Sequence, residues 1–153
     1  MYLLSSVELV KFYDETKKLL DIVDAEISEV NDKISNFDGD EQYESSGMIL
    51  RGWYQRLASL DEDRQGLRFE EYEDLEFHQC EKEIGLLREL AKNNKVLIDE
   101  SDFEEYTVVV CTDLGLVGGD SSVLVIDWEA TANNLMADYG SVVLGYTKFF
   151  YRK

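Results

Sequence analysis

Residues 6–38, SVELVKFYDETKKLLDIVDAEISEVNDKISNFD, contain an apolar seam that predicts one long helix. The seam advances by four and three residues in turn, a heptad spacing that places its members on one side of a helix. Ser5 or Ser6 is the expected N-cap, and Gly39 is the expected end of the helix. The seam consists of Leu9, Tyr13, Thr16, Leu20, Val23, Ile27, Val30, Ile34 and Phe37, with acidic residues on the opposite face.

Two further helical stretches are expected to pack against this seam. The first follows a predicted turn at residues 39–46 and carries Leu50, Trp53, Leu57, Leu60 and Leu67. Gly66 is expected to break or kink this stretch. The second, at about residues 69–92, carries Phe77, Cys80, Ile84, Leu87 and Ala91. Since short connections make neighbouring helices antiparallel, residues 1–95 predict a helical hairpin or a three-helix coiled-coil arm. The sequence leaves open whether the seam pairs within one chain or between two chains.

The pattern changes after Asn93 and Asn94, and residues 96–153 predict a small acidic α+β domain. Runs of β-branched residues at 106–112 and 122–126 predict two strands, with a hairpin turn at 115–120. Residues 128–139 predict a short helix and residues 142–151 a final strand. The expected fold class is α+β: the helical arm is followed by a β-β-α-β unit.

The chain is strongly acidic, with 15 Lys and Arg against 33 Asp and Glu in 153 residues, a net charge of −18. Nucleic-acid phosphates and anionic lipids repel such a chain, which argues against direct binding to nucleic acid or to a membrane surface. Hydrophobic residues make up 44% of the chain, too many for a disordered acidic tail. No apolar run is long enough to cross a membrane and no signal peptide is evident, so a cytoplasmic location is expected. For a phage-encoded protein this would be the host cytoplasm.

The acidic residues are unevenly distributed along the chain. No Lys or Arg lies between Lys95 and Lys148. Carboxylates held on a folded scaffold can imitate the phosphates of DNA, so the acids of this span are the predicted partner-binding residues. They are Asp99, Glu100, Asp102, Glu104, Glu105, Asp113, Asp120, Asp127, Glu129 and Asp138. A second acidic patch is predicted at Asp61, Glu62, Asp63, Glu70, Glu71, Glu73 and Asp74. The alternative is an ordinary solvated surface that keeps the protein soluble.

The sequence predicts no catalytic residue, no metal site and no cofactor. His78 is the single histidine, and a metal site built on it and Cys80 would need further His or Cys ligands. A surface histidine and a core thiol are expected instead. The glycine-rich segment 115–120 lacks the lysine and the following helix of a phosphate-binding loop. The protein is therefore expected not to be an enzyme.

Three short segments near the C-terminus carry a resemblance to a known family. They are residues 126–130 (IDWEA), 135–139 (LMADY) and 149–152 (FFYR). Together they resemble the closing segment of the ArdA antirestriction family, over about residues 122–152. Only Asp127, Trp128, Asp138, Tyr139 and Arg152 carry over individually.

The resemblance implies an acidic protein of a phage or mobile element that mimics DNA and blocks type I restriction-modification enzymes, usually as a dimer. It does not extend to that family's N-terminal α+β domain, in whose place this chain has its heptad-bearing arm.

The charge pattern and this resemblance together favour a DNA mimic that inhibits a host nucleic-acid-targeting defence enzyme, of the restriction-modification or CRISPR type, by occupying its basic DNA-binding cleft. The expected partner is a basic nucleic-acid-binding protein or enzyme complex, and homodimer formation is left open. One alternative is an immunity or antitoxin protein that binds a basic nuclease toxin through aromatic anchors such as Tyr106 or Tyr146. Another is a coiled-coil structural or interaction module whose acidity is incidental.

Overall fold

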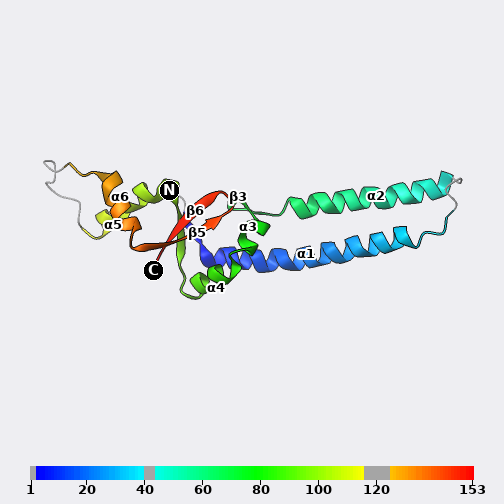
Figure 1. Ribbon diagram of the computed structural model, residues 1–153, viewed down its shortest axis with the longest axis horizontal. Coiled ribbons are helices and arrows are strands. Elements are labelled where there is room, and N and C mark those ends of the chain that lie inside the picture. Colours follow the sequence, from blue (N-terminus) through cyan, green and yellow to red (C-terminus); the bar gives the residue numbers. More distant parts are fainter. Residues whose placement is uncertain (1–2, 40–43, 116–124) are drawn as a thin grey trace. The chain divides into compact units, whose positions relative to one another are not determined.

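The computed structural model describes residues 3–39, 44–115 and 125–153 and contains both helices and strands, which confirms the expected α+β class (Figure 1). The chain divides into two compact units. The sheet unit consists of Met1–Lys11 together with His78–Lys153, and the hairpin unit consists of Phe12–Phe77. The division expected at residue 95 therefore falls inside the sheet unit.

The hairpin unit is built on two long antiparallel helices, α1 (Ser6–Ser35) and α2 (Glu44–Gln65) (Figure 1). The Ser5 hydroxyl accepts a hydrogen bond from the Glu8 backbone N–H at 3.3 Å, as expected of an N-cap. The helix α2 ends immediately before Gly66, as predicted. The heptad seam is confirmed, because its members are buried or half-buried within a single chain. The buried ones in this unit are Tyr13, Thr16, Leu20 and Val30, and Leu60 on α2 is buried as well.

The third helix predicted over residues 69–92 is wrong in its first half. A two-stranded antiparallel hairpin occupies that region, with β2 at Arg68–Phe69 and β3 at Tyr72–Glu76. Aromatic packing accounts for it: the Phe69 ring lies edge-on to Phe12 with centroids 5.1 Å apart, and Phe77 stacks on Tyr13 at 4.8 Å. The second half is helical, in two pieces, α3 (Phe77–Glu81) and α4 (Ile84–Lys92).

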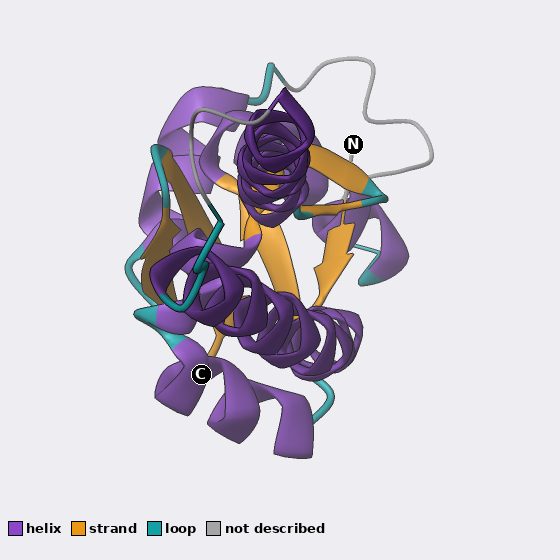
Figure 2. Cartoon of the chain, turned by 90° about the vertical axis from the view of Figure 1, so that its right-hand side faces the viewer, coloured by secondary structure: helices purple, strands orange, loops and turns teal. Residues whose placement is uncertain are grey.

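The sheet unit contains a four-stranded antiparallel sheet in the order β1-β4-β6-β5. Its strands are β1 (Leu3–Ser5), β4 (Val96–Asp99), β5 (Tyr139–Leu144) and β6 (Thr147–Arg152), drawn in orange in Figure 2. Alternation along the strands gives the sheet two buried faces. One carries Leu4, Leu97, Val142 and Phe149; the other carries Ile98 and Phe150.

The strand predicted over residues 106–112 is a helix instead. A 3₁₀ turn, η1 (Glu100–Asp102), leads into α5 (Phe103–Asp113). The hydroxyl of Thr107 donates to the Phe103 carbonyl at 2.8 Å, and that of Thr112 donates to the Val108 carbonyl at 2.7 Å. These bonds satisfy the threonine hydroxyls within the helix, so a β-branched run that favours a strand by propensity is accommodated.

The short helix predicted over residues 128–139 is present as α6 (Trp128–Met136). Residues from α5, α6 and the sheet form one apolar cluster, made of Ile98, Phe103, Ala132 and Phe150. The single final strand predicted over 142–151 is wrong: Gly145, with φ of +64°, turns the chain between β5 and β6. The strand predicted at 122–126 and the turn predicted at 115–120 fall mainly outside the described residues. No helix in the described part of the chain is long and apolar enough to cross a membrane.

Candidate acidic interface

Nine of the ten predicted partner-binding acids are described, and all nine belong to the sheet unit; Asp120 lies outside the described residues. They occupy the end of β4, the turn η1 and both ends of α5 and α6. Asp99 and Asp102 are half-buried; the exposed members are Glu100, Glu104, Glu105, Asp113, Asp127, Glu129 and Asp138. The fold therefore holds most of these carboxylates at defined positions on or beside regular elements.

Two of the nine acids have a local structural role. The Asp99 carboxylate accepts hydrogen bonds from the Ser101 backbone N–H at 2.9 Å and from its hydroxyl at 2.8 Å, which caps η1. The Asp127 carboxylate accepts from the Ala130 N–H at 3.0 Å and is the N-cap of α6. Replacing either residue would weaken a helix start, so neither is suitable for a test of partner binding.

The remaining acids differ in how well they suit their helices. Glu104, Glu105 and Glu129 lie in the first turns of α5 and α6, where the positive end of the helix dipole stabilises a carboxylate. Asp113 is the last residue of α5, and Asp138 follows α6, so both lie at the negative ends. There an acid costs roughly 0.3–1 kcal/mol. Helix stability therefore does not explain why acids occupy positions 113 and 138.

Basic side chains are scarce beside these acids. Neither α5 nor α6 contains a Lys or Arg, and the nearest cations in sequence are Lys95 before the span and Lys148 on β6. The Lys148 ammonium pairs with Glu100 at 3.9 Å, a long contact between two exposed side chains, and lies 4.9 Å from the centre of the Phe150 ring. Such an exposed pair contributes little.

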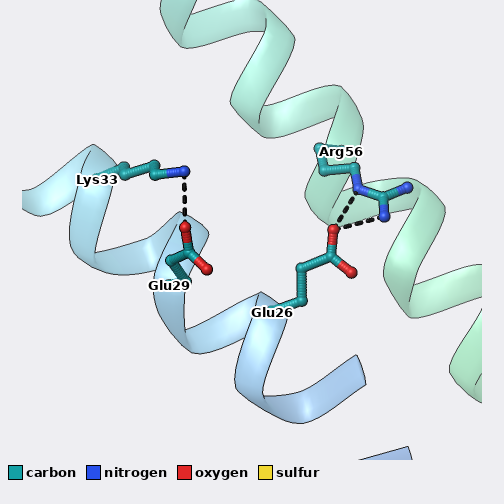
Figure 3. Close-up of polar contacts among 4 residues, drawn as sticks. All are labelled: Glu26, Glu29, Lys33 and Arg56. Carbon is teal, nitrogen blue, oxygen red and sulfur yellow. Dashed lines mark hydrogen bonds and ion pairs between the residues drawn. The ribbon is translucent and has the colours of Figure 1, made fainter. Parts of the chain in front are cut away.

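The hairpin unit balances its charges differently. Arg56 on α2 pairs with Glu26 on α1, its Nε lying 2.9 Å from the carboxylate, and Lys33 pairs with Glu29 at 2.9 Å (Figure 3). The hydrogen bond from Lys33, assisted by its charge, lowers the pKa of Glu29. Lys and Arg side chains on the long helices thus pair with several of their acids, whereas α5 and α6 contain no Lys or Arg.

The second predicted patch lies in the hairpin unit, and all seven of its acids are exposed. Three are near the end of α2 and four lie in the β2–β3 hairpin: Asp61, Glu62 and Asp63, then Glu70, Glu71, Glu73 and Asp74. The two arginines within this stretch bind acids outside the patch, since Arg64 pairs with Asp24 at 3.4 Å and Arg68 with Glu76 at 3.3 Å.

The two candidate aromatic anchors have different environments. The hydroxyl of Tyr106 lies 3.0 Å from that of Tyr139, and its ring packs on Phe103 with centroids 5.6 Å apart. Burial and this hydrogen bond raise the pKa of Tyr139. Tyr146, by contrast, is fully exposed in the β5–β6 turn. Tyr146 is therefore free to contact a partner, whereas Tyr106 has a structural role.

The expectation of a surface histidine and a core thiol is confirmed. His78 is exposed, whereas Cys80 is completely buried, and burial raises the pKa of its thiol to about 12. Across residues 3–39, 44–115 and 125–153, no three His, Cys, Asp or Glu side chains are grouped closely enough to hold a metal ion.

The β5–β6 turn is the part of the surface that sequence reasoning missed, because residues 142–151 were interpreted as one strand. The signal was Gly145, which interrupts an otherwise continuous apolar and β-branched run.

No family model matches this chain, and neither does any curated protein or solved structure. The ArdA resemblance stays a prediction from the residues that carry it, of which Asp127 and Tyr139 have structural roles here.

Proposed function

We propose that the protein is an acidic DNA mimic that inhibits a nucleic-acid-targeting defence enzyme of the restriction-modification or CRISPR type by occupying its basic DNA-binding cleft. The observation that carries the proposal is the set of carboxylates on η1, α5 and α6, in a span without any Lys or Arg. A concentration of one sign of charge on a folded surface raises the association rate with an oppositely charged cleft. The inhibitor needs no cofactor and would act in the host cytoplasm if a phage encodes it.

The spacing of the acids along α5 can be compared with the spacing of the phosphates along duplex DNA. Glu104 and Asp113 are nine residues apart on α5, which corresponds to about 13 Å along the axis. Duplex DNA carries one phosphate charge per about 1.7 Å of axis, so α5 alone has a much lower charge density. The acids of η1 and α6 must therefore contribute as well, and the cleft must accept a partial phosphate pattern.

The test neutralises the five exposed acids that neither cap a helix nor pair with Lys148: Glu104→Gln, Glu105→Gln, Asp113→Asn, Glu129→Gln and Asp138→Asn. The matched control neutralises five acids of the second patch, Asp61, Glu62, Asp63, Glu70 and Glu71, and so removes the same charge. Each protein is used to capture partners from a bacterial lysate and to inhibit DNA cleavage by the captured enzyme.

The first variant should lose about tenfold or more of its inhibition at low salt, and the control much less. Inhibition by the unmodified protein should also weaken with added salt. Unchanged inhibition by the first variant would refute the proposal, and equal losses in both variants would reduce it to an effect of net charge.

The immunity-protein alternative is favoured by one specific observation, the complete exposure of Tyr146. Tyrosine is common among residues that dominate binding energy at protein interfaces. If Tyr146→Ala abolishes capture of a basic nuclease while the five-acid variant still captures it, the immunity-protein function replaces the DNA mimic.

A further inference from the structure

We draw no further inference here: the strongest candidate, the set of exposed apolar side chains along the long helices α1 and α2 of the hairpin unit (Leu19, Ile22, Met48 and Ile49), carries none because nothing in the structure shows what covers it.

Discussion

Phe103 packs the start of α5 into the apolar cluster of the sheet unit. Its side chain is completely buried, and its ring lies 5.1 Å from Phe150, 5.2 Å from Tyr139 and 5.6 Å from Tyr106, measured between centroids. The substitution Phe103→Ala should lower the free energy of unfolding by about 3–5 kcal/mol, the usual cost of removing a buried phenyl ring. The upper part of that range is expected, because edge-on ring pairs add about 0.5–1.5 kcal/mol each.

Urea denaturation can measure this loss within the sheet unit. Trp128 belongs to the sheet unit and Trp53 to the hairpin unit, so a Trp53→Phe background leaves Trp128 as the only tryptophan. With a slope of about 2 kcal/mol per molar urea, a loss of 4 kcal/mol would move the midpoint down by about 2 M.

The control is Val143→Ala, at a side chain that is 54% exposed, which should change stability by less than about 0.5 kcal/mol. If Phe103→Ala loses less than about 1 kcal/mol, the ring is not enclosed as described and α5 is not held by it.

Three further outcomes follow from the packing and the charges. Gly140→Ala should destabilise the protein by about 1 kcal/mol in thermal unfolding, the lower end of the usual cost of overpacking. A Cβ there would lie 2.3 Å from the far end of the half-buried Tyr151 ring, which must move aside. Relief of this loss by Tyr151→Leu would identify the ring as its cause. Cys80, with its pKa raised to about 12, should react with iodoacetamide at pH 8.5 far more slowly in the native protein than in urea. Because the unfolded thiol ionises from about pH 8.5, its contribution to stability should be lost as pH rises from there toward 12, and Cys80→Ala should lack this loss. Glu26→Gln should cost less than about 1 kcal/mol, and less again in 1 M salt, since its pair with Arg56 is exposed.

The long helices could be predicted because their signal is local and repeated. The heptad seam of α1 needs no knowledge of its partner, and Gly66 marks the end of α2. The strand predicted over residues 106–112, in the region of α5, was wrong because β propensity is a weak preference that tertiary packing overrides. A better signal was present: Phe103, Tyr106, Thr107 and Val110 share one face of a helix, and acids occupy the first turn.

The candidate interface was only partly predictable for a different reason. The absence of basic residues between 96 and 147 is a property of the sequence, and the structure places the nine described acids of this span in the sheet unit. Asp99 and Asp127 cap η1 and α6, so their roles depend on where these two elements begin. The sequence did not predict η1. The position of β5 at an end of the sheet depends on the order of the strands, which no local pattern encodes.

The strand order also bears on how the sheet assembles. The inner strand β6 follows every other strand of the sheet along the chain and bonds to both β4 and β5. Its pairing with β5 crosses only a tight turn, whereas β1 reaches β4 across ninety residues of intervening chain. A ribosome-bound chain halted before residue 147 would lack the strand that connects these two pairings. We therefore expect such truncated chains to be degraded rather than to persist.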